Sequence, residues 1–253
     1  MPIKIEKDYP VYTVIINNQE VKNAVDGKTA IELADAFRKF EKDQQALVAV
    51  LWGAEGNFCS GANLKAITEG TGNRIETNGD GPMGPTRMIL SKPVIAAIAG
   101  YAVAGGLELA IWCDLRVVEK SAIFGVFCRR FGVPLIDGGT VRLPRLIGMS
   151  HALDMILTGR PVTAEEAYNW GLANRIVENG QSRLKAEELA KEISKFPPIC
   201  MMNDRLSVYK QFGLKLEEAL KSEFELGLKT LESEEYIKGS KDFMLGKGKH
   251  GKF

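Results

Sequence analysis

Residues 93–116, PVIAAIAGYAVAGGLELAIWCDLR, contain the pattern that decides the fold. The first part, PVIAAIAG (93–100), is a short apolar run typical of a buried strand. A glycine pair then begins GGLELAIWCD (105–114), a short and mostly apolar helix, and DLRVVEK (114–120) supplies the next strand. A strand that passes through small residues into a helix and then into another strand predicts an α/β fold with buried sheets.

The residues upstream repeat this alternation. VYTVII (11–16) and ALVAVLWG (46–53) are β-branched runs that flank a helical segment, in which Leu33, Phe37 and Phe40 recur at helical spacing. A second strand-to-helix junction, EGNFCSGANLKAI (55–67), follows the second run. Helix-start N–H groups are unsatisfied donors, and small residues let a ligand approach them. If the two turns converge, they place two N–H groups on one oxygen, as an oxyanion hole requires.

Two other regions differ from this core. Residues 67–87 are rich in Gly, Thr and Asn and lack periodicity, which predicts a mobile loop or partial helix beside a binding site. After about residue 180 strand signals vanish and amphipathic helices follow. One of these helices has an apolar stripe formed by Leu216, Leu220, Phe224, Leu228 and Leu231. We therefore predict an α/β core over residues 1–195 and a helical oligomerisation region over residues 196–253.

Composition excludes several classes of protein. The 253 residues carry a formal net charge of +1, which favours neither nucleic acid nor an anionic membrane as a partner. Four separated cysteines and two histidines, His151 and His250, show no metal-binding or redox spacing. The N-terminus has no signal-peptide pattern, and no run is long enough to span a membrane, so we expect a cytoplasmic protein. The basic tail, residues 246–252, reads as a solvated end or as a supplier of charge to ligand phosphates.

Four motifs in order resemble the crotonase (enoyl-CoA hydratase/isomerase) superfamily. They are FCSGANLK (58–65), GYAVAGGLELAIWCD (100–114), GGTVRLPRLIG (138–148) and LTGRPVTAEEAYNWGL (157–172). The resemblance covers nearly the whole chain. It implies a spiral of ββα units with a C-terminal helical trimerisation region, a homotrimer or dimer of trimers, and an acyl-CoA thioester substrate. Coenzyme A is then part of the substrate, and no separate cofactor or metal is expected.

The resemblance also implies roles for individual residues. The backbone amides of Ala62 and Gly105 would form the oxyanion hole, although small residues at these positions also suit tight strand–helix packing. Glu108 matches the first catalytic glutamate of family hydratases, and the alternative is a first-turn carboxylate that favours the helix dipole. The groove for coenzyme A would be formed by Val21, Lys22, Ser60, Gly61, Ala62, Asn63 and Leu64. Asn63 stands where the family often has Asp.

Family hydratases use two catalytic glutamates, and this sequence departs from that pattern at the second one. Cys128 occupies its position. A thiol beside Arg129 and Arg130 has a lowered pKa if the arginines face it, but an inert core cysteine is the simpler interpretation. Asp137 stands where related double-bond isomerases place a catalytic aspartate. It also precedes Gly-Gly-Thr and a helical run, as a helix N-cap does.

We therefore expect an acyl-CoA enzyme, nominally an enoyl-CoA hydratase, with Glu108 and Asp137 as its acid–base pair. Alternatives within the class are a double-bond isomerase and an acyl-CoA hydrolase. An alternative of another class is a non-catalytic acyl-CoA- or RNA-binding relative. The sequence does not specify the length and identity of the acyl chain or which of these reactions is catalysed. It also does not specify the pathway, or whether the oligomer is a trimer or a hexamer.

Overall fold

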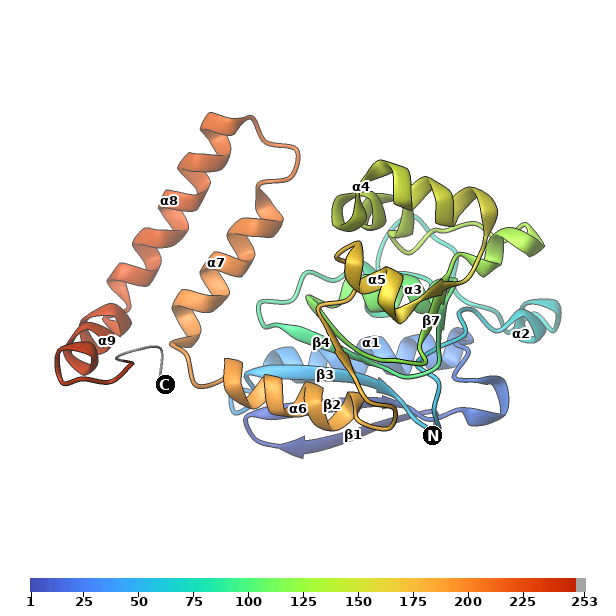
Figure 1. The fold of residues 1–253 in the computed structure, drawn as a ribbon, viewed down its shortest axis with the longest axis horizontal. Coiled ribbons are helices and arrows are strands. Elements are labelled where there is room, and N and C mark those ends of the chain that lie inside the picture. The colour runs from blue at the N-terminus through green and yellow to red at the C-terminus, as the bar shows by residue number, and fades with distance from the viewer. Residues whose placement is uncertain (249–253) are drawn as a thin grey trace. The chain divides into compact units, whose positions relative to one another are not determined.

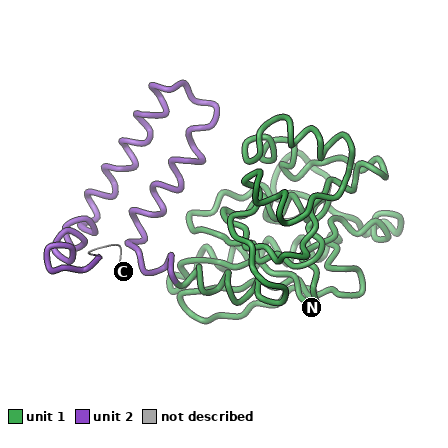
Figure 2. Tube along the Cα trace, in the orientation of Figure 1, with its two compact units in different colours: residues 1–191 green, residues 192–253 purple. Residues whose placement is uncertain are grey.

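The computed structural model describes residues 1–248, so Lys249, His250 and the rest of the basic tail lie outside the described residues. The chain divides into two compact units, residues 1–191 and residues 192–253, coloured green and purple in Figure 2. The first unit contains the strands and most of the motifs discussed above. The second is helical.

A six-stranded sheet forms the centre of the first unit (Figure 1). Its order is β1 (Ile3–Asp8), β2 (Val11–Ile16), β3 (Val48–Gly53), β4 (Val94–Ile98), β6 (Leu115–Glu119) and β9 (Arg175–Val177). β1 and β2 pair antiparallel, and every later pair is parallel. Every residue of β2 and β4 is buried, which explains why these strands read as continuous apolar runs.

A three-stranded sheet packs in the same unit, with β7 (Ile123–Gly125) between β5 (Tyr101–Val103) and β8 (Val162–Thr163). The chain therefore leaves the large sheet at the end of β4, enters the small one through β5, and passes directly into α3 (Gly105–Trp112). The mixed α/β fold and the strand–turn–helix over residues 93–116 are confirmed.

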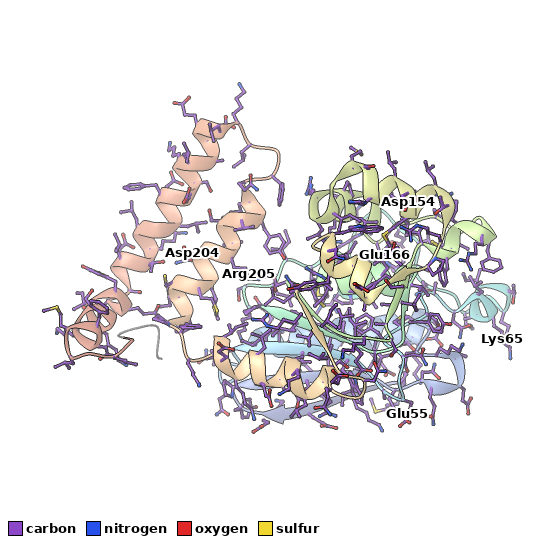
Figure 3. All side chains as sticks on the ribbon, viewed as in Figure 1. Glu55, Lys65, Asp154, Glu166, Asp204 and Arg205 are labelled. Atoms are coloured by element: carbon purple, nitrogen blue, oxygen red, sulfur yellow. The ribbon has the colours of Figure 1, made fainter. Side chains whose placement is uncertain are left out.

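Helices and 3-10 turns fill the connections of the first unit. They are η1 (Gln19–Val21), α1 (Gly27–Lys42), α2 (Leu64–Thr68), η2 (Pro85–Arg87), η3 (Phe127–Phe131), α4 (Gly139–Thr158), α5 (Ala164–Asn169) and all but the last two residues of α6 (Ser182–Ile193). In α1 the predicted residues Leu33, Phe37 and Phe40 are fully buried. The helix is begun by Asp26, whose side chain accepts a hydrogen bond from Thr29 N at 2.8 Å. Lys65 marks α2, and Glu55 the turn that precedes it, in Figure 3.

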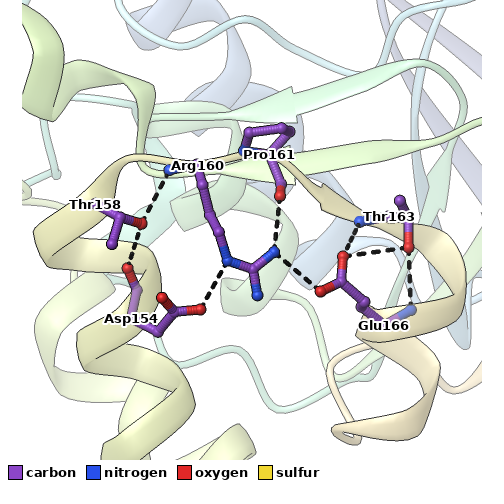
Figure 4. Close-up of polar contacts among 6 residues, drawn as sticks. All are labelled: Asp154, Thr158, Arg160, Pro161, Thr163 and Glu166. Atoms are coloured by element: carbon purple, nitrogen blue, oxygen red, sulfur yellow. Dashed lines mark hydrogen bonds and ion pairs between the residues drawn. The ribbon is translucent and has the colours of Figure 1, made fainter.

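A cluster of charged residues joins α4 to α5 (Figure 4). Arg160 donates to Asp154 of α4 at 2.8 Å and to Glu166 of α5 at 2.9 Å. Thr163 and Glu166 form a capping box, in which each residue's side chain accepts from the other's backbone N–H. These contacts fix the end of α4, which is kinked at Gly148, where φ is 77° and ψ is 163°.

The second unit comprises α7 (Pro198–Lys210), α8 (Leu216–Glu232) and α9 (Glu235–Met244). Asp204 and Arg205 lie on α7 in Figure 3. α7 packs along α8. The predicted stripe on α8 is exposed at all five positions, from 41% at Leu228 to 76% at Leu216. An exposed apolar stripe is typical of an interaction surface, and its role in oligomerisation stays a prediction.

Candidate active site

Two turns of the first unit lie side by side, which is the condition for an oxyanion hole formed by both. The turn after β3 forms a parallel bridge to β5: Cys59 N donates to Tyr101 O at 2.9 Å and Val103 N donates to Cys59 O at 3.2 Å. The contact is close enough to require glycine at one position. A Cβ added to Gly61 would lie 3.0 Å from the backbone nitrogen of Gly105.

The N–H group of Ala62 is turned toward open space by its neighbours. Val25 N donates to Gly61 O at 2.8 Å, and Asn63 N donates to Val25 O at 2.9 Å. The Gly61 carbonyl and the Ala62 N–H belong to one planar peptide and point in opposite directions. Ala62 N–H therefore points away from Val25, and within residues 1–248 it meets no protein acceptor.

Within the described part of the chain, the N–H group of Gly105 also donates to no protein acceptor, for a related reason. Gly105 is the first residue of α3, so this donor has no partner within the helix. Ala104 precedes it with φ 53° and ψ −125°, a strained conformation for a residue with a side chain. The Ala104 carbonyl accepts from Glu108 N at 3.2 Å inside the helix, which points the Gly105 N–H outward.

Glu108 lies one turn into α3 and is only 2% exposed. Its Oε1 accepts from the backbone N–H groups of Asp137 and Gly139, each at 2.8 Å. Its Oε2 has no protein hydrogen-bond partner in the described part of the chain. Glu108 therefore ties α3 to the start of α4 with one oxygen and leaves the other for a ligand.

The surroundings of Glu108 disfavour its charged form. Burial raises the pKa of this carboxyl to about 7, and the nearby Asp137 carboxylate also raises it. The two backbone donors act in the opposite direction but do not compensate. A carboxyl with a pKa near 7 exchanges protons readily at neutral pH, as a general acid or base must.

Asp137 does not cap α4. The residue before the helix is Gly138, and among residues 1–248 no side chain caps the helix start. The Oδ1 of Asp137 instead accepts from Met83 N at 2.9 Å and from the Thr86 hydroxyl. The N-cap interpretation was wrong because the side chain turns toward a segment more than fifty residues earlier. Asp137 is 4% exposed, and burial raises its pKa.

A cavity of about 530 Å³ joins these features. Ala62, Gly105, Glu108 and Asp137 all line it, and so do Ser60, Leu64 and Cys128. Residues 67–87 contribute a wall, as predicted from their composition, through Ile67, Gly70, Gly72, Asn73, Ile75, Pro82 and Met83. The predicted catalytic and oxyanion-hole residues are thus brought together in one cavity.

The other predicted groove residues lie beside Ser60, outside the cavity lining. Ser60 N donates to Lys22 O at 3.1 Å, and its hydroxyl donates to Val21 O at 3.0 Å. The Lys22 ammonium lies 5.1 Å from the ring centre of Tyr101. Asn63 is the N-cap of α2. Its Oδ1 accepts hydrogen bonds from the backbone N–H groups of Lys65 and Ala66. Gly61 holds the turn described above.

Cys128 lies in η3, is 8% exposed and lines the cavity. Burial raises the pKa of its thiol, and the nearby Glu108 acts in the same direction. The side chains of Arg129 and Arg130 instead donate to carbonyls at the end of α4, those of Ile156 and Gly159. The interpretation as an inert thiol agrees with this geometry, because an activated nucleophile needs a lowered pKa.

Sequence reasoning missed the partners of Asp137, namely Met83 and Thr86. Both lie in the aperiodic segment 67–87, where neither helical nor strand spacing indicates which residues face inward. Across residues 1–248, no group of three or more His, Cys, Asp or Glu side chains is placed to hold a metal ion. The described helices also include none that combines the length and apolarity of a membrane span.

Comparison with known proteins finds relatives over most of the chain. The family model described as enoyl-CoA hydratase/isomerase matches residues 6–250. A carnitinyl-CoA dehydratase of Proteus mirabilis is 36% identical over 209 residues, which cover 82% of this chain and 80% of that protein. The crystal structure of the enoyl-CoA hydratase EchA1 from Mycobacterium marinum matches with a TM-score of 0.91 and 30% identity, covering 96% and 95% of the two chains. An enoyl-CoA hydratase structure from Mycobacterium tuberculosis matches with a TM-score of 0.91 and 31% identity.

Proposed function

The chain belongs to the enoyl-CoA hydratase/isomerase (crotonase) family, and from this premise we propose that it is an enoyl-CoA hydratase. It adds water across the Cα=Cβ bond of an enoyl-CoA, or removes water in the reverse direction. The acyl-CoA substrate class follows from the family. The observation that carries the proposal is the free Oε2 of buried Glu108 in the same cavity as the unpaired amides of Ala62 and Gly105.

In this proposal the two amides hold the thioester oxygen. Hydration forms a bond between the water oxygen and the β-carbon, and the electrons of the double bond move to the thioester oxygen as an enolate. Two fixed donors stabilise that charge, and loss of one such donor typically costs about 10²–10³ in rate. Segments 58–65 and 21–22 bind the coenzyme A part of the substrate.

Glu108 and Asp137 handle the protons. One carboxylate removes a proton from the attacking water, and the other carboxyl gives a proton to the α-carbon as the enolate collapses. One proton transfer between the two groups then restores the starting state. Their shared cavity and raised pKa values support this pairing.

A double-bond isomerase is the second candidate, because Cys128 stands where hydratases have their second glutamate. The same two carboxyls would then move a proton from one carbon to another without water. An acyl-CoA hydrolase would use the same amides. A non-catalytic acyl-CoA- or RNA-binding relative has less support, since it leaves the free oxygen of Glu108 unexplained. A cytoplasmic location and a homotrimer or dimer of trimers remain part of the proposal.

The test is crotonyl-CoA hydration, followed by loss of enoyl absorbance, for the parent, Glu108→Gln and Asp137→Asn. We expect turnover by the parent and a loss of about 10²–10⁴ in kcat in each variant. Glu119→Gln is the matched control, because Glu119 is a buried glutamate bound to Ser182 outside the cavity. A parent that is inert on crotonyl-CoA but shifts a 3-enoyl-CoA to the 2-enoyl isomer favours the isomerase. Full activity in Glu108→Gln would contradict both the hydratase and the isomerase proposals.

A further inference from the structure

Thr86, in η2, is buried against the Asp137 carboxyl. It is 1% exposed, and its hydroxyl donates to Asp137 Oδ1. Met83 N donates to the same oxygen at 2.9 Å. Of Thr86 and Asp137, only Asp137 lines the cavity. The hydroxyl therefore contacts the carboxyl from within the protein, and Thr86 itself does not reach a ligand.

The surrounding chain holds Thr86 and Asp137 together. Arg142 of α4 donates to Asp137 O at 2.9 Å and to Thr86 O at 2.7 Å, which joins α4 to η2. Gly81 packs against both side chains, because a Cβ added to it would lie 2.0 Å from Thr86 Oγ1 and 2.7 Å from Asp137 Oδ1. A side chain at residue 81 would therefore displace the hydroxyl from the carboxyl.

The two oxygens of Asp137 differ in their surroundings. A carboxylate oxygen offers two lone pairs, and Oδ1 uses one for Met83 N–H and the other for the Thr86 hydroxyl. Oδ2 accepts no hydrogen bond within residues 1–248, yet it retains accessible surface in a residue that lines the cavity. A proton on Asp137 is therefore directed to Oδ2, the oxygen that a ligand can reach.

The Thr86 hydroxyl also acts on the proton affinity of Asp137. Burial raises the pKa of Asp137, and this hydroxyl is the group that most strongly lowers it. The charged and titratable groups around the Asp137 and Glu108 carboxyls in the described chain are Arg87 of η2, Cys128 of η3 and Arg142 of α4. The two arginines lower the pKa of Asp137 less than the hydroxyl does. Loss of the hydroxyl should therefore make Asp137 bind its proton more tightly.

We propose that Thr86 is a positioning residue, which keeps Oδ1 of Asp137 occupied so that Asp137 takes up and releases its proton at Oδ2. This inference rests on the proposed function, because it assumes that Asp137 carries a proton during turnover. The step is a proton transfer only, in which the proton moves between Oδ2 and the attacking water or the α-carbon. Thr86→Val leaves one lone pair of Oδ1 unoccupied, and the proton can then reside there, out of reach of the substrate.

The experiment measures the pH profile of kcat/KM for crotonyl-CoA in the parent, Thr86→Val and Thr86→Ser. Thr86→Val removes the donor with little change in shape. We expect a limb of its profile to move up by about one pH unit, the effect of one hydrogen bond to a charged group. The direction is the same whether Asp137 acts as the acid or as the base, because in both cases its proton is held more tightly.

Two variants serve as controls. Thr86→Ser keeps the donor, so its profile should have the limbs of the parent. Thr13→Val is the matched control, because Thr13 is 3% exposed and its hydroxyl donates to the Glu187 carboxylate at 2.9 Å outside the cavity. Its limbs should also coincide with those of the parent. If Thr86→Val does not fold, Thr86→Ala takes its place with the same expectation.

Limbs that coincide in Thr86→Val and the parent would overturn the inference even if kcat falls, because the hydroxyl would then only hold the loop in place. A shift of equal size in Thr86→Ser or Thr13→Val would also overturn it, since the shift would not depend on this donor.

If the parent turns over no enoyl-CoA, the proposed function fails separately, and denaturation then tests Thr86 without any reaction. Thr86→Val raises the pKa of Asp137 in the folded state only, so its stability should fall further than that of the parent as pH rises from about 4 to 8. In an Asp137→Asn background, Thr86→Val should change stability equally at every pH. An effect of Thr86→Val that is independent of pH in both backgrounds would overturn the inference.

Discussion

Glu108→Gln is expected to stabilise the protein at alkaline pH. In the parent, burial raises the pKa of this carboxyl from an ordinary value of 4.5 to about 7. The folded state therefore binds an additional proton between these values, and its stability falls as pH rises from about 4.5 through 7. Glutamine keeps an acceptor for Asp137 N and Gly139 N but carries no titratable proton.

The size of the effect follows from the two pKa values. Between pH 5 and pH 8 the folded parent loses about 2.5 kcal/mol of its free energy of unfolding through this group. Glu108→Gln lacks this loss. The difference between the two pH profiles reports Glu108 together with the change that its removal causes in the neighbouring Asp137, provided that the protein concentration is the same in all samples.

The measurement is chemical denaturation of both proteins at closely spaced pH values from 5 to 8. We expect the two profiles to diverge, with the parent losing stability most steeply between pH 5 and pH 7 and the divergence levelling off above pH 7. Parallel profiles would refute the reasoning, because they would mean that Glu108 titrates alike in the folded and unfolded chains. Its assignment as a proton carrier at neutral pH would then lose its physical basis.

Two further predictions concern the cavity. Gly61→Ala places a Cβ 2.9 Å from the Cβ of Ala104, at a residue whose φ is 101°. We expect the free energy of unfolding, measured by denaturation, to fall by about 1–3 kcal/mol. We also expect a lower kcat in the turnover assay. Gly56→Ala, also at positive φ but with no atom within 4 Å, is its control and should retain kcat. Cys128→Ser should leave kcat nearly unchanged, because burial raises the pKa of the thiol; a loss as large as that in Glu108→Gln would restore the nucleophile hypothesis.

Local pattern was sufficient for much of the fold. The apolar runs became β2, β3 and β4, and the helical spacing of Leu33, Phe37 and Phe40 became the buried face of α1. These features depend on neighbours in sequence, and so does the placement of Glu108 on the helix that Gly105 begins.

The contacts of Asp137 were beyond local reasoning. A residue before Gly-Gly-Thr and a helix has the sequence context of an N-cap, yet Asp137 binds Met83 and Thr86. Such a choice depends on which distant segment fills the space beside the carboxylate.

The peptide between Gly61 and Ala62 cannot rotate without breaking the hydrogen bond from Val25. A donor held in this way contributes little to the binding of a neutral carbonyl, because water solvates that carbonyl equally well. It contributes much more to the binding of an oxygen that carries full charge. Inhibitors of this protein should therefore be ranked by the charge on the oxygen they present rather than by their resemblance to the substrate. A stable enolate mimic attached to coenzyme A would be the natural starting compound.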